Sequence, residues 1–206
     1  ATARPAWSLL YLLTARIHEL RSQPDMALEA YTRAIDLGSR EPQAIRRAIG
    51  LLYERQRYSE AYALIQRLSE QQTPFSADLA RLASDVSLRL DDFDRALELA
   101  RNNARDSTNY LDHVWLGQVL TVMGMAAQQQ SAEGKTFLDE AEQSFSQAIT
   151  LKVDAPDAWV ALILFFGQTG DTEKAEAAIA EAQQKIPQGI APLALAQCYE
   201  AMGRME

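Results

Sequence analysis

The chain has 206 residues, of which 48% are apolar and 23% are charged, a composition that is ordinary for a folded globular protein. Its net charge of −8 argues against general binding to nucleic acid, and its longest apolar run, residues 158–166, is too short to insert across a membrane. The single cysteine, Cys198, excludes an internal disulfide and a multi-cysteine metal site, and it leaves the compartment open.

Three helix pairs are predicted in the first half of the chain, over residues 5–41, 42–73 and 74–107. Apolar residues recur three and four positions apart on both sides of a short polar break in each segment, which is the period of an amphipathic helix. In the first segment, Pro5 suits the first position of a helix, and residues 22–25 mark the turn before the second helix.

The fourth pair, residues 108–154, is irregular. Ala141, which opens its second helix, comes about 12 residues later than a regular repeat would place it. The surplus lies around residues 125–138, and helix-forming residues fill most of it up to the polar stretch 131–134. We expect a lengthened first helix, a short polar loop and an early start to the second helix; a functional insertion is the alternative.

The fifth pair, residues 155–188, is the most regular of the set. Gly170 and Asp171 separate two helices, with large apolar residues on the first and small ones on the second, so the two can approach closely. A partial sixth unit, residues 189–206, stops where its second helix should begin. Because repeat arrays close with a polar capping helix, we expect the sequence to be a fragment of a longer protein.

Charge is spread unevenly along these units. Residues 1–105 hold 15 Arg and no Lys against 14 acidic residues, whereas residues 106–206 hold four Lys and one Arg against 14 acidic residues. Such an asymmetry can orient a charged partner along the array. The other interpretation is that charged residues on solvent-exposed helix faces have varied without any effect on function.

A small residue lies near the start of each second helix, and the spacing of these residues along the chain gives the length of the repeat. These residues are 34, 35, 45 and 34 positions apart, and they are Ala27, Ala61, Ala96, Ala141 and Ala175. The positions four and seven residues further on recur in step with them, mostly as bulky apolar and as small residues. Recurrence of three positions over five units predicts a solenoid.

Residues 156–187 carry the strongest resemblance to a known family. Trp159, Leu162, Phe166 and Ala175 stand at the spacing of the tetratricopeptide repeat (TPR) family, which this segment resembles. The resemblance implies an all-α fold: a right-handed superhelical solenoid of antiparallel helix pairs, with about five repeats and a partial sixth in a single array over residues 1–206.

Two departures from the family pattern are expected in the earlier repeats. In the second, matching Ile49-Gly50 and Tyr53 to the family's Leu-Gly and Tyr leaves the turn one residue short. In the third, matching Leu82-Ala83 leaves one extra residue before Phe93.

The residues that could carry chemistry are few. His18 and His113 lie 95 residues apart, and neither has a nucleophile pattern beside it. The acidic run 91–94 lacks the glycine and the distal glutamate of a calcium loop, and acidic residues suit a turn that leads into a helix. The sequence therefore predicts no enzyme activity, no catalytic residue, no metal and no cofactor.

The resemblance implies that the first helices line a concave groove that receives the ligand. Carrying the family's groove positions over to this sequence predicts a peptide-binding groove with arginine at its N-terminal end and apolar and amide side chains further on. Its predicted residues are Arg16, Arg47, Arg55, Ser84, Val114, Gln118, Val160, Leu164, Gln168 and Gln197. The family's carboxylate clamp is not expected, since the required asparagines are absent.

We therefore predict a non-catalytic scaffold that binds a peptide or partner protein in this groove, acidic where it meets the arginines. Two alternatives stay open. The chain could be the regulatory or substrate-recruiting module of an enzyme whose catalytic domain lies outside this segment. It could also self-associate through its C-terminal helix.

Overall fold

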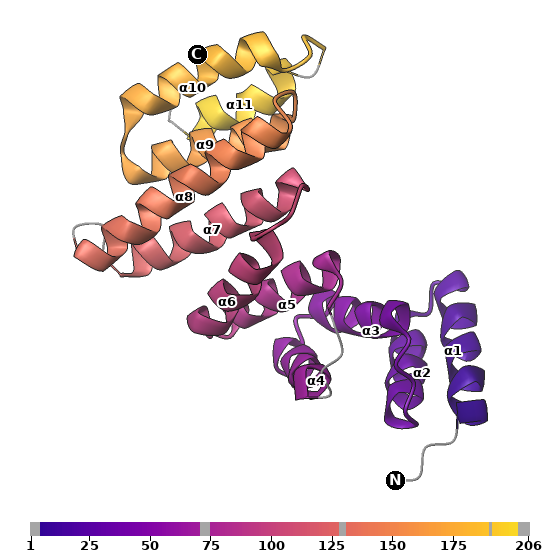
Figure 1. Cartoon of the computed structure of the whole chain (residues 1–206). Coiled ribbons are helices and arrows are strands. Elements are labelled where there is room, and N and C mark those ends of the chain that lie inside the picture. Colours follow the sequence, from indigo (N-terminus) through magenta and orange to yellow (C-terminus); the bar gives the residue numbers. More distant parts are fainter. Residues whose placement is uncertain (1–4, 71–74, 128–130, 190, 202–206) are drawn as a thin grey trace. The chain divides into compact units, whose positions relative to one another are not determined.

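The computed structural model describes residues 5–70, 75–127, 131–189 and 191–201, and these residues form α-helices and the connections between them (Figure 1). The helices are α1 (Pro5–Leu20), α2 (Pro24–Asp36), α3 (Pro42–Glu54), α4 (Tyr58–Glu70), α5 (Ala77–Arg89), α6 (Phe93–Ala104), α7 (Tyr110–Ala126), α8 (Ala132–Leu151), α9 (Pro156–Thr169), α10 (Thr172–Lys185) and α11 (Ala191–Ala201). The described residues contain no strand, so the predicted all-α class is confirmed.

The chain divides into two compact units, Ala1–Ala96 and Leu97–Glu206. In unit 1, each of α1 to α4 packs on the helix that follows it in the chain, and α3 also packs on α5. In unit 2, the same holds for α7 to α10, and α11 packs on α9 and α10. A helix that packs mainly on its sequence neighbours is the organisation of a solenoid, and the single array over both units stays a prediction.

The small residues that open the second helices are packed without any exposure. All five have no accessible surface: Ala27, Ala61, Ala96, Ala141 and Ala175. A larger side chain at these positions would push the paired helices apart, since protein interiors are closely packed. The predicted repeat unit is therefore present in the structure.

Four of the turns between paired helices share one backbone arrangement. In each, a residue one or two positions after the end of the first helix has a positive φ of 54° to 81°. The N–H of the residue that follows it donates to the carbonyl oxygen five residues back at 2.9 Å. This is a Schellman-type helix end. The positive-φ residues are Ser22, Gln56, Asp91 and Gly170.

These equivalent turns correct the register of the second and third repeats. The expected short turn after Tyr53 and the extra residue before Phe93 are wrong, because both turns have the same length as the turn at Gly170. The buried positions agree, since α3, α5 and α9 each bury the same six positions of the repeat. Matching Gly50 to the small residue of the family pattern shifted the second repeat by one residue, whereas the structure places Ile49 at that buried position.

The turn at Gln56 provides a test of this equivalence. A side chain at positive φ costs about 1–2 kcal/mol, of which the greater flexibility of glycine in the unfolded chain offsets part. We expect Gln56→Gly to raise the free energy of unfolding by about 0.5–1 kcal/mol in urea denaturation. The matched reverse change, Gly170→Gln, should lower it by a similar amount, and the same sign for both would contradict the shared turn.

The surplus residues of the fourth repeat lengthen both of its helices, as predicted. α7 and α8 pack closely at Gly124, where there is no room for a side chain. A Cβ added there would lie 2.6 Å from Leu138 Cδ2 and 3.1 Å from the Gly134 carbonyl oxygen. The predicted polar loop at residues 131–134 is wrong: α8 begins at Ala132, and the Ser131 hydroxyl caps it by accepting from the Gly134 N–H at 2.9 Å. Most of the polar stretch 131–134 is therefore the first turn of a helix.

The partial sixth unit begins with α11, whose Leu195 and Cys198 are buried in unit 2. Residues 202–206, where the missing cap was expected, lie outside the described residues. The expectation of a longer parent protein stays a prediction.

Candidate functional site

The outer faces of α1, α3 and α5 form what we call the first-helix surface of unit 1. Outside the six buried positions of α3 and of α5, the remaining positions are exposed or partly exposed, and half of them are charged. On α3 they include Gln43, Arg46 and Arg47, and on α5 they include Asp78 and Arg81. α3 and α5 thus present charged side chains beside a buried base, whereas α1 also exposes large apolar side chains.

Two hollows lie on this surface. One, of about 570 Å³, lies between α1 and α3 and is lined by Leu12, Arg16, Glu19, Leu20, Tyr31, Glu41, Gln43, Ala44 and Arg47. The other, of about 480 Å³, lies between α3 and α5 and is lined by Gln43, Arg46, Arg47, Gly50 and Leu82. Gln43 and Arg47 line both hollows, so an occupant of either would meet these two side chains.

Arginines on this surface pair with carboxylates of the same unit. Arg16 bonds to Glu41 at 2.9 Å, and Arg46 bonds to Asp78 at 2.9 Å. The side chains of both arginines stay about half exposed. An exposed ion pair contributes at most about 1 kcal/mol, so a carboxylate from outside could replace either acidic partner at little cost.

Arg47 is also about half exposed, but its carboxylate partner is itself bound to a buried side chain. Its Nε donates to Glu19 Oε1 at 2.6 Å, and the Tyr31 hydroxyl donates to Glu19 Oε2 at 2.7 Å. Burial, together with the hydrogen bond to Glu19, raises the pKa of Tyr31 to about 12. Glu19 therefore links a buried tyrosine of α2 to Arg47 of α3 and fixes the arginine between the two hollows.

The fold of the chain resembles those of several solved structures. The chain aligns with MamA (TM-score 0.69, 14% identity, 86% of this chain and 91% of that chain). It also aligns with YrrB, described as a TPR protein with an unusual peptide-binding site (0.64, 19%, 91% and 90%). A third match is TTC0263, a TPR protein of Thermus thermophilus (0.63, 19%, 95% and 98%). The chain has the tetratricopeptide repeat fold.

Comparison of the sequence adds nothing to this likeness, since no protein-family model and no curated protein matches the chain. The TPR fold therefore rests on the three-dimensional similarity and on the repeat pattern. At identities below a fifth, the similarity establishes the architecture, and the surface residues have to be judged from their own geometry.

Two of the predicted groove residues in this TPR unit line the hollows, namely Arg16 and Arg47. Arg55 lines neither, because its guanidinium is mostly buried at the end of α3, where it bonds to Asp25 at 2.6 Å and to the Leu51 carbonyl at 3.0 Å. Ser84 is fully buried and donates to the Ala96 carbonyl oxygen at 2.7 Å. With the corrected register, its groove position passes to Asp85.

Arg46 is the residue that the sequence prediction missed. It lines the second hollow, and the register shift had assigned its position to Arg47. A count from the turn residue Gln56, in place of a match to Gly50, would have placed it on the groove face.

In unit 2, the predicted groove residues of the TPR repeats lie on α7 and α9. Gln118 and Gln168 are exposed, Val160 and Leu164 are partly exposed, and Val114 is buried with 7% of its surface accessible. The side chain of Gln197 lies outside the described residues. Whether the exposed members bind a ligand stays a prediction.

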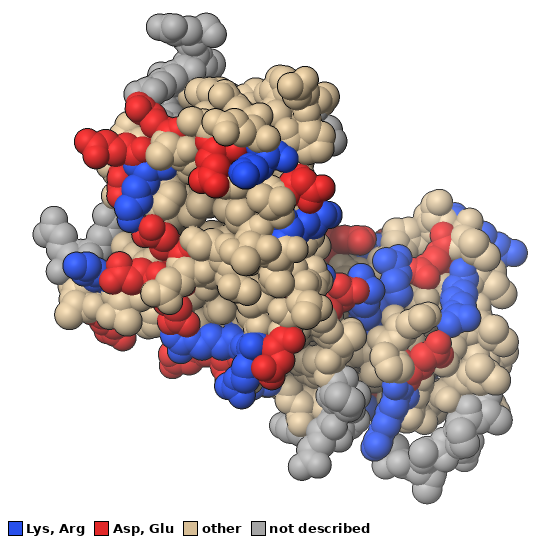
Figure 2. Space-filling view, turned by 45° about the horizontal axis from the view of Figure 1, so that its top comes forward, with Lys and Arg blue, Asp and Glu red and all other residues tan. Residues whose placement is uncertain are grey.

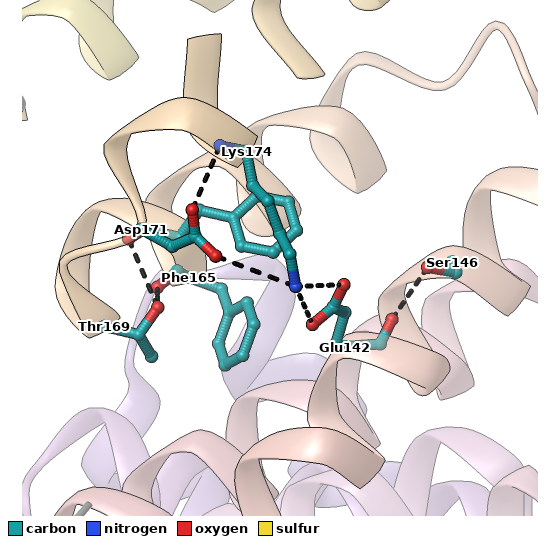
Figure 3. Close-up of polar contacts among 7 residues, drawn as sticks. Glu142, Ser146, Phe165, Thr169, Asp171 and Lys174 are labelled. Atoms are coloured by element: carbon teal, nitrogen blue, oxygen red, sulfur yellow. Dashed lines mark hydrogen bonds and ion pairs between the residues drawn. The ribbon is translucent and has the colours of Figure 1, made fainter. Parts of the chain in front are cut away.

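The second helices of unit 2 carry their own polar links. Figure 3 shows Lys174 of α10 reaching Glu142 of α8 at 2.8 and 2.9 Å, with Asp171 at 3.7 Å. The hydrogen bond to Glu142 raises the pKa of Lys174. Its ammonium also lies 5.3 Å from the centre of the Phe166 ring. Such links join neighbouring repeats, and Figure 2 shows basic and acidic side chains interspersed on the visible face.

The candidate chemical residues have structural contacts. His18 Nδ1 lies 2.9 Å from Gln23 Oε1, and His113 Nε2 lies 3.0 Å from the Ser107 carbonyl oxygen. Asp92 accepts from the Arg95 N–H at 3.3 Å at the start of α6, and burial raises the pKa of Cys198. Within the described ranges, no cluster of three metal-binding side chains and no helix suited to spanning a membrane occurs.

Proposed function

We propose that the chain is a non-catalytic interaction scaffold, and that the first-helix surface of unit 1 binds an acidic peptide segment. The observation that carries the proposal is the pair of hollows that share Gln43 and Arg47, with half-exposed Arg16 and Arg46 on either side. Its likeness in fold to YrrB, a TPR protein with a peptide-binding site, supports a peptide as the ligand.

The three arginines would act differently. Arg16 and Arg46 would exchange Glu41 and Asp78 for carboxylates of the peptide, because these ion pairs are exposed and weak. A guanidinium can hold a carboxylate with two parallel hydrogen bonds, which fixes the orientation of the ligand. Arg47, held by Glu19, would keep its place and offer its remaining N–H groups, while the Gln43 amide would bond to the peptide backbone.

The binding test uses short fluorescent peptides of equal length that differ only in their number of glutamates. We expect affinity for the wild-type chain to rise with the number of glutamates and to fall with added salt. The triple change Arg16→Glu, Arg46→Glu and Arg47→Glu should weaken binding of the most acidic peptide by at least about tenfold, as measured by fluorescence anisotropy.

The matched control is Arg101→Glu, which reverses an exposed arginine that pairs with Glu140 and lines neither hollow. This variant should bind the peptides as the wild type does. Equal binding by the triple variant and the wild type would refute the proposed surface.

In unit 2, we propose Gln118, Val160, Leu164 and Gln168 as a more apolar ligand surface of that unit by itself. Their amides could bond to a peptide backbone while the aliphatic pair contacts an apolar side chain. The alternative role, a regulatory or recruiting module of an enzyme, would use the same surfaces and differ in the domain to which the chain is joined.

A further inference from the structure

Gly50 lies inside α3 at a place where packing does not require a glycine. A glycine within a helix is destabilising relative to alanine, so it usually serves close packing or function. Gly117 and Gly124 serve packing, since a Cβ on either would lie 2.7 Å or 2.6 Å from a neighbouring side chain. A Cβ on Gly50 would have nothing within 4 Å. The space beside Gly50 therefore needs another explanation.

The other first helices that end in the same turn carry a side chain at this position. Counted from those turns, the residues that correspond to Gly50 are Arg16 in α1, Asp85 in α5 and Leu164 in α9. In α3, the missing side chain leaves room beside the helix backbone. A backbone that a ligand approaches closely is one of the places where glycine is favoured.

This room belongs to the hollow between α3 and α5, which we call the Gly50 hollow. The hollow lies between neighbouring repeats, since α3 packs on α2, α4 and α5. Its volume of about 480 Å³ falls within the range of pockets that hold small ligands. Leu82 of α5, whose side chain is partly exposed, lies in its lining together with Gly50. The hollow thus combines open space with an apolar wall.

The two arginines in the lining add to this apolar character. The guanidinium of Arg46 is bonded to Asp78, and that of Arg47 is bonded to Glu19. Neither carboxylate lines the Gly50 hollow. With their charged ends held there, the arginines present chiefly their aliphatic stems to the hollow, as long basic side chains commonly do.

The charged ends of the same arginines favour a carboxylate beside the hollow. Both side chains stay about half exposed, and none of the residues that line the Gly50 hollow is acidic. An occupant would therefore meet an apolar lining inside the hollow and positive charge next to it.

We propose that the Gly50 hollow receives an aliphatic side chain of the acidic peptide, so that the ligand of unit 1 is a segment in which a leucine-like residue lies next to glutamates or aspartates. The inference rests on the proposed function, because the acidic peptide is itself proposed there. Arg46 and Arg47 would hold the carboxylates, and the Gly50 hollow would select the residue between them.

Two fluorescent peptides of equal length and equal glutamate content test the proposal. One has a leucine between its glutamates and the other has an alanine at that place. In fluorescence anisotropy, the wild type should bind the leucine peptide at least about fivefold more tightly, because part of the leucine side chain is buried. Added sodium chloride should weaken both peptides and leave this ratio unchanged, since salt screens the charges and not the apolar contact.

Gly50→Leu fills the hollow from the protein side. Leucine already occupies the corresponding position of α9, at Leu164, and it favours a helix more than glycine does, so the urea midpoint should not fall. The variant should still bind the alanine peptide, whereas the ratio between the two peptides should drop to about one. The matched control is Ala63→Leu, which adds the same side chain at an exposed position of α4 outside the hollow and should preserve the ratio.

The aliphatic hollow and the acidic-peptide surface can fail separately. If the wild type binds both peptides equally, or if the leucine preference survives Gly50→Leu, the aliphatic hollow is wrong; weaker binding by the triple arginine variant would then still support the surface. If neither peptide binds the wild type, or if the triple variant binds both as the wild type does, both proposals are wrong.

Discussion

Replacing Phe145 with alanine is expected to lower the free energy of unfolding by about 3–5 kcal/mol, the largest effect of any change considered. Phe145 is 1% exposed, and its ring centre lies 5.5 Å from that of Phe165 in α9. On its other side the ring lies against Gly117 of α7. The residue thus fills the space among three helices of unit 2, and its removal leaves a cavity that closely packed helices cannot close.

The measurement is urea denaturation followed by circular dichroism, with midpoints compared at equal slope. Leu151→Ala is the control, because Leu151 lies on the same helix with 36% of its surface exposed and should cost less than about 1 kcal/mol. A loss below about 1 kcal/mol for Phe145→Ala would show that the α7–α8–α9 packing is wrong.

The second large effect is expected at Gly117. A Cβ at this position would lie 2.7 Å from two atoms of the Phe145 ring, closer than real contacts allow. Overpacking costs about 1–3 kcal/mol, and the better helix propensity of alanine returns up to about 1 kcal/mol. We expect Gly117→Ala to lower the free energy of unfolding by about 1–2 kcal/mol.

Gly50→Ala is the matched control with the opposite sign. Gly50 lies inside α3 with nothing within 4 Å of a Cβ, so alanine should stabilise the chain by about 0.5–1 kcal/mol. In a chain that already carries Phe145→Ala, Gly117→Ala should stabilise as well, because the ring it would meet is gone. A loss at Gly117 that persists without the ring would point to a different cause.

The repeat architecture could be predicted because close packing of the paired helices requires particular residue types at particular positions of each repeat. A second helix can approach its partner only where the side chain is small, so Ala27, Ala61 and Ala96 recur 34 and 35 residues apart and are fully buried. The lengthened hairpin of α7 and α8 was predictable for the same reason, since its surplus residues favour helix.

The register within a repeat was harder to predict, because a buried position does not fix the residue type. The position held by Ile49 in α3 is held by Ser84 in α5, where the hydroxyl bonds to a backbone carbonyl instead of packing as an apolar group. Matching by residue type therefore placed the register of the second and third repeats one residue away from its position in the structure. The turns would have given the right count, but a non-glycine residue at positive φ, as at Gln56, leaves little trace in the sequence.

The candidate site could be predicted only in part, because exposure of an arginine depends on its partners. Arg16 and Arg55 look alike in sequence, yet one stays about half exposed beside Glu41 and the other is largely covered beside Asp25. Which carboxylate lies within reach is a property of neighbouring repeats, more than 20 residues apart in the chain.

The link from Tyr31 through Glu19 to Arg47 also bears on how the candidate surface responds to alkaline pH. With its pKa raised to about 12 by burial and by the bond to Glu19, the tyrosine hydroxyl keeps its proton where a free tyrosine would lose it. Its contribution to stability is complete below pH 10 and is lost only as pH rises towards 12. At neutral and mildly alkaline pH, Tyr31 thus remains a donor to Glu19, and a rise in pH within this range does not break the hydrogen bond that positions the partner of Arg47.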